Sequence, residues 1–209
     1  MKTVYFTAVL LVLATMTGCG MAKKSSAQDV LSGMESYSAR AEVTYISNKG
    51  ENTCDTVQYA KKDGRYRIDT LAPEEYKGIS VIYDGKLVWQ TVAGEKYKIK
   101  VASNNTERAL PLLYSFWENH SRSAEDAAVT TSARPGGRVT VLEADIPGGS
   151  RMFAAEKLWF DEEKGVPERL VVFNDEGKEK IVVKFADFKY NENIEDSVFS
   201  PIEQSKKEE

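Results

Sequence analysis

The sequence predicts an α+β fold in which one curved antiparallel sheet carries helices on one face. Polar and apolar residues alternate with a period of two over most of residues 39–190, as half-buried strands do. The alternating segments are joined by short turns rich in Gly, Asn and Asp, which make neighbouring strands antiparallel. Two apolar stripes at helical spacing supply helices that can cover the apolar face of such a sheet.

The N-terminus has the pattern of an export signal. Lys2 precedes an apolar run over residues 4–14, which is shorter than the about 20 residues that a membrane-spanning helix needs. The run leads to Met16-Thr17-Gly18-Cys19, which resembles the bacterial lipoprotein cleavage site, although leucine is usual where Met16 stands. At that site the cysteine is diacylglycerylated and becomes the new N-terminus, and two acyl chains such as palmitate hold a protein on a membrane. We therefore expect lipid attachment at Cys19; the alternative is a small residue late in an ordinary signal peptide.

Length and composition fit one globular domain behind this leader. The chain has 209 residues, of which 42% are hydrophobic and 29% charged, an ordinary globular composition. We expect a signal peptide over residues 1–18, a tether over 19–27, the domain over 28–201 and a disordered tail over 202–209. The net charge is −4 and no long basic run occurs, so the composition argues against nucleic-acid binding.

The first half of the domain predicts one helix followed by strands. Ser25 and Gln28 have the spacing of a capping box at the start of the helix. Its apolar stripe consists of Val30, Leu31, Met34 and Tyr37. We expect strands over residues 39–45, 53–60, 65–70, 79–83, 86–92 and 96–101. Between two of them, Asp84-Gly85 is typical of a type I′ hairpin turn.

The middle of the chain predicts a second helix over residues 104–120. Its apolar face carries Leu110, Leu112, Leu113, Phe116 and Trp117. Pro111 has no N–H group, so we expect it at the first helical position. The simplest interpretation of Leu112, Leu113, Phe116 and Trp117 is packing in the core of the bent sheet. Two alternatives stay open, namely the wall of a cavity that contacts an acyl chain and a surface that binds a partner.

The last third predicts a plain meander. Ser123 and Asp126 suggest a short capped turn before Thr130. Strands are then expected over residues 138–145, 154–161, 167–174 and 178–190, which brings the total to roughly nine or ten. Residues 191–201 form an irregular tail.

Several short motifs follow one another along the chain in a fixed order. They are Tyr83-Asp84-Gly85-Lys86 with Trp89, Leu158-Trp159-Phe160-Asp161, Gly165-Val166-Pro167-Glu168-Arg169, Asn174-Asp175-Glu176-Gly177, Phe185-Ala186-Asp187-Phe188, Asn191, Ile194 and Asp196-Ser197-Val198-Phe199. This set extends over residues 29–201 and resembles the LolA/LolB-like superfamily of outer-membrane lipoprotein-sorting proteins. In style it is most similar to the lipid-anchored clostridial branch, which includes the germination lipoprotein GerS. The resemblance implies an unclosed β-barrel with helices covering the concave face.

The resemblance also implies a function. Named members of the superfamily shuttle or receive lipoproteins through an apolar cavity, whereas the clostridial branch acts as a partner of a spore-cortex amidase. We therefore expect a non-catalytic, membrane-anchored lipoprotein that binds and supports an extracytoplasmic cell-wall amidase in spore germination. The alternatives are a lipid or lipoprotein carrier or receptor, and an envelope-stress regulator. The expected location is extracytoplasmic, with the lipid anchor in the cell membrane or, by resemblance, the spore membrane.

The residues that could carry catalysis are few. The single histidine, His120, ends the second predicted helix, where the helix dipole favours it. Asp161, Glu162 and Glu163 fall in a hairpin turn, where solvated carboxylates are usual. Once Cys19 is acylated, Cys54 is the only thiol left, so no intrachain disulfide can form and its role stays open. We therefore expect no enzyme activity, no metal site and no cofactor.

The edges of the sheet offer another way to bind a partner. Edge strands of an unclosed sheet expose unpaired N–H and C=O groups, to which a further strand can be added. We expect edge pairing to contribute to complexes with a protein partner, or to a homodimer formed by strand pairing or swapping.

Overall fold

The computed structural model of the chain describes residues 26–92, 95–99, 112–123 and 128–201. Its strands are β1 (Ser36–Ser47), β2 (Gly50–Lys61), β3 (Tyr66–Ala72), β4 (Ser80–Tyr83), β5 (Val88–Val92), β6 (Glu95–Ile99), β7 (Val129–Arg134), β8 (Gly137–Ser150), β9 (Phe153–Asp161), β10 (Val166–Phe173) and β11 (Glu179–Tyr190). Its described helices are α1 (Ala27–Ser32), α2 (Leu113–Arg122) and the 3-10 helix η2 (Asp196–Phe199).

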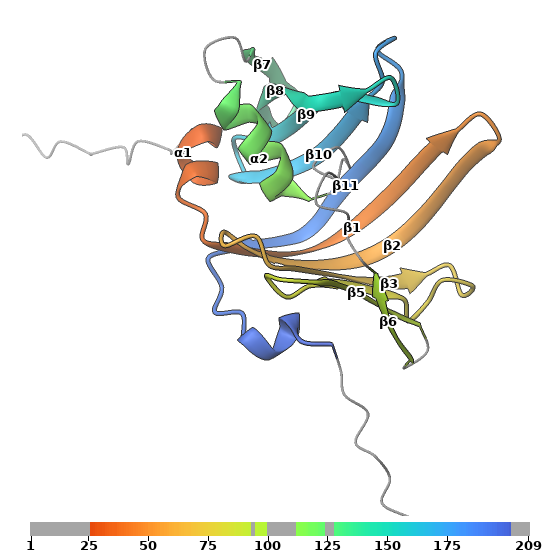
Figure 1. Cartoon of the computed structure of the whole chain (residues 1–209). Coiled ribbons are helices and arrows are strands. Elements are labelled where there is room, and N and C mark those ends of the chain that lie inside the picture. Colours follow the sequence, from red (N-terminus) through yellow and green to blue (C-terminus); the bar gives the residue numbers. More distant parts are fainter. Residues whose placement is uncertain (1–25, 93–94, 100–111, 124–127, 202–209) are drawn as a thin grey trace, which may run out of the picture.

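All of these strands belong to one eleven-stranded sheet with the order β6-β5-β4-β3-β2-β1-β11-β10-β9-β8-β7. Every neighbouring pair is antiparallel, and the first and last strands, β1 and β11, pair at its centre. The sheet bends strongly, and its two ends, β6 and β7, do not pair with each other (Figure 1). The prediction of a single curved, unclosed antiparallel sheet is confirmed.

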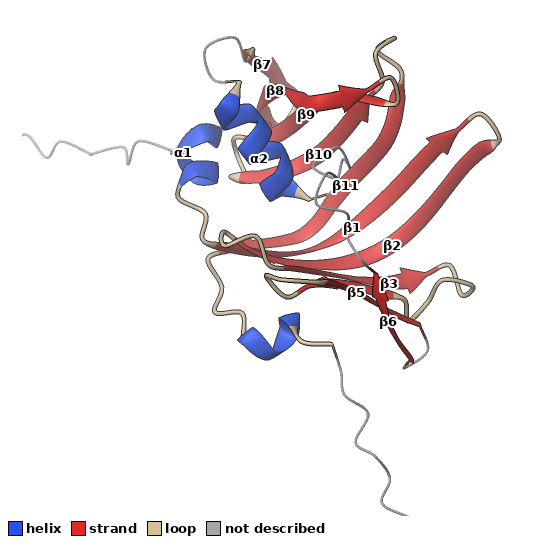
Figure 2. Ribbon diagram, viewed as in Figure 1, coloured by secondary structure: helices blue, strands red, loops and turns tan. Residues whose placement is uncertain are grey.

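The core lies on one face of the sheet, which we call the inner face. Along β1 the side chains of Tyr37, Ala39, Ala41 and Val43 are buried, in the alternation that the sequence predicts. Leu142, Leu158, Leu170 and Val183 continue the same core cluster across β8, β9, β10 and β11. Figure 2 shows α1 and α2 against this half of the sheet, and their buried residues belong to the same cluster. Burial of this apolar surface is the main force that holds the helices on the sheet.

The opposite face, which we call the outer face, is covered near β3 by the C-terminal segment. Phe199 of η2 is 1% exposed but lies outside the main core cluster. The cationic groups of Lys61 and Arg65 lie over its ring, 5.6 and 5.3 Å from the centroid, and both pair with Asp196. Arg67 donates to the carbonyl of Val198 at 3.2 Å. The segment that the sequence predicts as irregular thus contains one short helix that is fixed to β2 and β3.

The first predicted helix is shorter than expected. The capping box of α1 is formed by Ser26 and Asp29, one residue later than the predicted pair, with Asp29 N–H donating to Ser26 Oγ at 3.2 Å. The helix ends at Ser32, and Tyr37 belongs to β1 instead. The spacing of Tyr37 continues the helical stripe, but pairing of β1 with both β2 and β11 decides its conformation.

Three further predictions need correction or fall outside the described residues. The sequence predicts no strand at β7, because Val129–Arg134 shows no apolar alternation; all six residues are exposed. The hairpin after Tyr83 places Gly85 (φ 96°) at the first central position and is closed by Asp84 and Leu87, as in a type II′ turn rather than type I′. Helix α2 begins at Leu113, and Pro111 lies outside the described residues.

The family-like motifs mark hairpin turns. Asp84 accepts hydrogen bonds from the backbone N–H groups of Lys86 and Leu87 and from Trp89 Nε1, each at 2.8 Å. Asn174 in the β10–β11 turn accepts in the same way from the N–H groups of two residues that follow it. Side-chain oxygens that satisfy turn N–H groups fix the hairpin geometry. The structure thus gives these motif residues structural roles.

Candidate binding surfaces

The predicted apolar face of the second helix is turned toward the sheet. Leu112, Leu113 and Phe116 are 2%, 0% and 0% exposed and belong to the core cluster. Trp117 is partly buried against that cluster. The helix packs on β8, with Phe116 stacked on His120 one turn later at a centroid distance of 5.8 Å. These four side chains therefore lie between α2 and the sheet.

A buried tyrosine joins the start of α2 to the sheet. The hydroxyl of Tyr37 accepts a hydrogen bond from the N–H of Leu113 at 3.2 Å and donates to Gln58 Oε1 at 3.3 Å. Its ring stacks on Phe188 at 5.4 Å, and burial raises the pKa of its hydroxyl. Because α2 has no side-chain cap, the Tyr37 hydroxyl satisfies one of the helix N–H groups that would otherwise lack a partner.

A buried carboxyl group lies under α2. Glu156 of β9 is 1% exposed and points to the inner face with Leu158 and Phe160. Its Oε2 accepts from Asn119 Nδ2 at 3.1 Å, whereas Oε1 has no partner among the described residues. Burial raises the pKa of Glu156 to about 7, and the hydrogen bond from Asn119 opposes this only in part. Glu156 is not among the predicted site residues, although it alternates in phase with the apolar Leu158 and Phe160.

The two sets of residues considered for catalysis have structural roles. His120 is 2% exposed and its Nδ1 lies 2.7 Å from the carbonyl oxygen of Glu143, so this nitrogen carries the proton. Asp161 and Glu162 are not solvated as predicted, since they are 3% and 7% exposed. Glu162 accepts from the hydroxyl of Thr140 at 2.6 Å.

Asp161 joins the β9–β10 turn to β7. Burial alone would raise the pKa of Asp161, but hydrogen bonds from the N–H groups of Lys164 and Glu163 bring it below its usual value. Its Oδ2 also pairs with the guanidinium of Arg134 at 3.1 Å, and this guanidinium pairs with Glu168. The cluster therefore holds the last residue of β7 against β10.

Toward β3, β4 and β5 the described residues cover the inner face less completely. Ile68, Val81 and Tyr83 pack against the core cluster but are only partly buried. Cys54 lies on the same face opposite Val43, as a half-buried free thiol whose pKa is raised by burial. An apolar ligand would find its contact surface on this part of the inner face.

One polar pocket lies where the two ends of the domain meet. It has a volume of about 310 Å³ and is bounded by the start of β1, the β2–β3 turn and residues 192–194. Its lysines already have acidic partners, with Lys62 Nζ 2.6 Å from Glu35 and Lys61 Nζ 2.7 Å from Asp196. These paired charges of both signs favour no particular ligand class.

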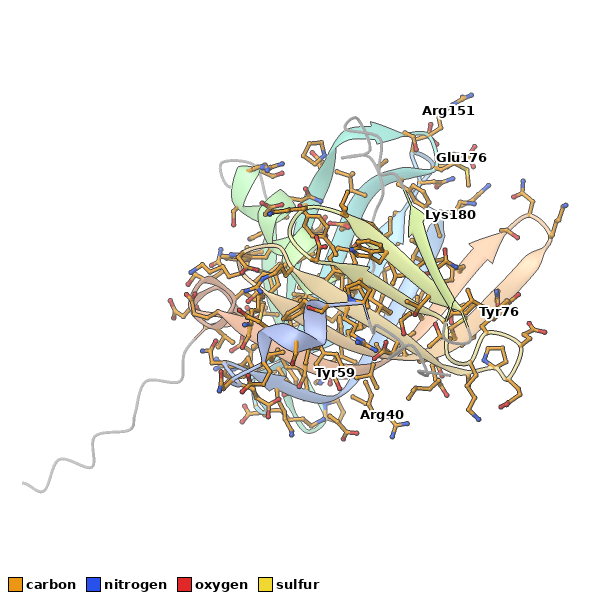
Figure 3. All side chains as sticks on the ribbon, turned by 60° about the horizontal axis from the view of Figure 1, so that its bottom comes forward. Arg40, Tyr59, Tyr76, Arg151, Glu176 and Lys180 are labelled. Atoms are coloured by element: carbon orange, nitrogen blue, oxygen red, sulfur yellow. The ribbon has the colours of Figure 1, made fainter. Side chains whose placement is uncertain are left out.

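The six polar side chains labelled in Figure 3 do not converge on one site. Figure 3 shows Arg151, Glu176 and Lys180 near one another at one end of the sheet, whereas Arg40 and Tyr59 lie in a different region and Tyr76 on a separate loop. Among the residues that the structure describes, no three His, Cys, Asp or Glu side chains are placed to hold a metal ion. Within the same residues, no helix is long and apolar enough to span a membrane. Cys19 lies outside the described residues.

Residues 1–199 match the family model of the YdcC-like sporulation proteins. The chain belongs to this family. The match includes both the N-terminal residues with Cys19 and the described domain as far as Phe199. No curated protein matches the chain.

Several solved structures are similar to this YdcC-like protein. An uncharacterized conserved protein from Thermus thermophilus has a TM-score of 0.52 and 17% identity, over 84% of this chain and 93% of the other. A LolA superfamily protein from Nitrosomonas europaea has a TM-score of 0.44 and 12% identity, over 84% and 98% of the two chains. The structure of the CwlD amidase from Clostridioides difficile in complex with the GerS lipoprotein contains a chain that matches with a TM-score of 0.48 and 24% identity, over 78% and 91%. At 17% identity, the match to the Thermus thermophilus protein shows a shared fold.

Proposed function

We propose that this YdcC-like protein is a non-catalytic lipoprotein that binds and supports an extracytoplasmic partner enzyme, a cell-wall (spore-cortex) amidase. The observation that carries the proposal is the family match over residues 1–199, because it joins the lipoprotein-like leader and the open sheet in one sporulation family. The amidase as partner class comes from the resemblance of the sequence motifs to the clostridial branch described above.

The proposal includes an anchored location. Diacylglycerylation of Cys19 holds the chain on the outer side of the cell membrane or spore membrane, because two acyl chains bind a bilayer stably. Removal of residues 1–18 leaves a tether that ends at α1. Helices α1 and α2 cover the concave face of the sheet, and a homodimer through an open sheet edge is part of the same proposal.

The described side chains support a binding role over catalysis. A hydrolytic site needs a nucleophile beside a base, or a metal with several ligands. His120, the base considered above, has its Nδ1 at a backbone carbonyl and is buried between Phe116 and Trp117. Asp161 is engaged by the turn that follows it and by Arg134. Both residues stabilise the fold, so the protein acts through its surfaces.

A carrier or receptor for lipids or lipoproteins is the second candidate. Partial burial of Ile68, Val81 and Tyr83 on the inner face favours it, because an acyl chain could complete their burial. Native mass spectrometry of the purified protein distinguishes the candidates, since a carrier retains bound lipid and a binding module does not.

Capture of the tagged full-length chain from sporulating cells of the source organism tests the first proposal. After solubilisation of the membranes in mild detergent, we expect a cell-wall amidase in the captured material, identified by mass spectrometry. Cys19→Ala is the matched control, since it should move the chain to the soluble fraction and still capture the amidase. Recovery of no wall enzyme at micromolar bait, or cleavage of peptidoglycan by the purified chain alone, would contradict the proposal.

A further inference from the structure

The two edges of the sheet are protected to different degrees. β6 contains Lys96 and Lys98, and lysines on an edge strand hinder pairing with another chain. β7 has the sequence Val-Thr-Thr-Ser-Ala-Arg, all of it exposed, with no lysine, proline or break in its pairing with β8. Its one charged side chain, Arg134, is bound to Glu168 and Asp161. β7 is therefore an open, almost uncharged edge.

The pairing register identifies the free backbone groups of β7. The N–H of Glu143 donates to the carbonyl of Ala128 at 3.0 Å, so this pair and every second pair beyond it are hydrogen-bonded. Residues 130, 132 and 134 therefore direct their backbone groups to β8. Val129, Thr131 and Ala133 direct theirs away from β8, and the sheet order ends at β7.

We propose that β7 pairs with β7 of a second copy of this chain, antiparallel about a two-fold axis at Thr131. In that register Thr131 lies opposite its own copy, and Val129 lies opposite Ala133 of the second copy. Every residue in these pairs directs its backbone groups to the side on which no described strand follows β7. About six main-chain hydrogen bonds can therefore form, because each hydrogen-bonded pair exchanges two.

The side chains of β7 also fit a second copy. Thr131 Oγ1 already lies 2.8 Å from Thr140 Oγ1 of β8, so the pairing continues a threonine ladder across both copies. Arg134 lies opposite Ala128 of the second copy, so the two arginines stand at opposite ends of the strand pair and do not face each other. Val129, which is 44% exposed, loses solvent contact on pairing.

The size of the contact sets its strength. A pair of six-residue strands buries less than the roughly 1,200–2,000 Å² of stable interfaces, so the dimer is weak in dilute solution and forms at high local concentration. The inference rests on the homodimer included in the proposed function, and its test in membranes also uses the lipid anchor, but neither depends on the amidase.

Disulfide trapping of the full chain in its membranes tests this register. Thr131→Cys places two thiols at the two-fold axis, where a Cα–Cα distance of about 5.5 Å is within the range of a disulfide. We expect a covalent dimer on a non-reducing gel after mild oxidation. Thr130→Cys is the matched control, since it is equally exposed but lies opposite Ser132 of the second copy; we expect at least about ten-fold less dimer. The unchanged chain, oxidised in the same way, shows how much covalent dimer forms through Cys54.

Ala133→Pro in the Thr131→Cys background separates pairing from folding. The N–H of Ala133 points away from β8, so proline removes a bond to the second copy and none within the chain. We expect the dimer to be lost while circular dichroism stays unchanged. Equal trapping of the 131 and 130 variants, or trapping that survives Ala133→Pro, would overturn the proposal. A disulfide from position 131 to a different protein would overturn it too, and amidase capture is unaffected by any of these results.

Discussion

At the scale of single residues, the buried carboxyl group of Glu156 makes the stability of the fold depend on pH. Glu156 is paired with Ala144 of β8 and Val172 of β10, and within the described part of the chain one oxygen of its carboxyl group has no hydrogen-bond partner. A carboxylate without enough hydrogen bonds is costly to bury, so the group stays protonated to higher pH than usual. Folding and the proton on Glu156 are therefore coupled.

Glu156→Gln should remove this pH dependence. The folded-state pKa is raised from 4.5 to about 7, so the stability of the wild type is full below the lower value and declines as pH rises through this window. Because glutamine cannot ionise, we expect the variant to match the wild type near pH 4 and to exceed it above pH 7, by up to about 3 kcal/mol. Urea unfolding of the chain without its leader at both pH values measures the difference. Glu51→Gln, at an exposed position of β2, is the control. A stability difference between Glu156→Gln and the wild type that does not change with pH would contradict the coupling.

Tyr37 and Gln58 form a second buried polar unit. Tyr37→Phe leaves the N–H of Leu113 and the side chain of Gln58 without their partner, so we expect a loss of about 1–3 kcal/mol of stability. Gln58 Nε2 has no hydrogen-bond partner in the part of the chain that the structure describes, so adding Gln58→Met to the variant should restore part of the loss. Urea unfolding of the single and double variants measures this coupling. A double variant that loses the full sum of the two single changes would contradict it.

The sequence could identify some of these residues but not their roles. The motif residues Asp84 and Asn174 were found by resemblance, and the structure explains them as acceptors for turn N–H groups. Glu156 was missed because only the phase of β9 places it inside, and charged residues are seldom buried. Asp161 and Glu162 were expected in solvent because Arg134 and Thr140, their partners, are distant in sequence.

At the scale of elements, α2 is held by its apolar face. Phe116 is 0% exposed within the core cluster, so Phe116→Ala should cost about 3–5 kcal/mol, whereas Glu118→Ala on the exposed side should change stability by less than about 0.5 kcal/mol. Thermal or urea unfolding of the two variants compares them. If Phe116→Ala kept its stability and lost a bound lipid or partner, the face would be a binding surface and the core interpretation would fail.

The helices and strands show which elements can be predicted from the pattern of apolar residues. Segments such as β1 and β9 were predicted because apolar residues alternate along them, and the burial of their side chains alternates in the same way. β7 was missed because a strand exposed on both faces has no apolar alternation to detect. The end of α1 was placed too late because Tyr37 lies in phase with the helical stripe, and only long-range pairing with β2 and β11 assigns it to β1.

At the scale of the whole molecule, the sheet brings the two ends of the domain together. β1 and β11 pair at the centre, and Asn191 Oδ1 accepts from the N–H of Glu35 at 2.7 Å beside the start of β1. If Cys19 carries lipid, the seven residues from there to Ser26 span at most about 25 Å. We therefore expect the α1 end of the domain to stay close to the bilayer and the β1–β2 hairpin, at the far end of two twelve-residue strands, to point away from it.

The partition of amidase activity between membranes and soluble fraction tests the central claim most directly. In spores that carry the unchanged chain, we predict that cortex-amidase activity sediments with the membranes. In spores that carry only Cys19→Ala, the same activity should move to the soluble fraction together with the variant chain. An amidase distribution that is identical in both strains, with the chain itself relocated, would contradict the account of a lipid-anchored protein that works by holding an enzyme.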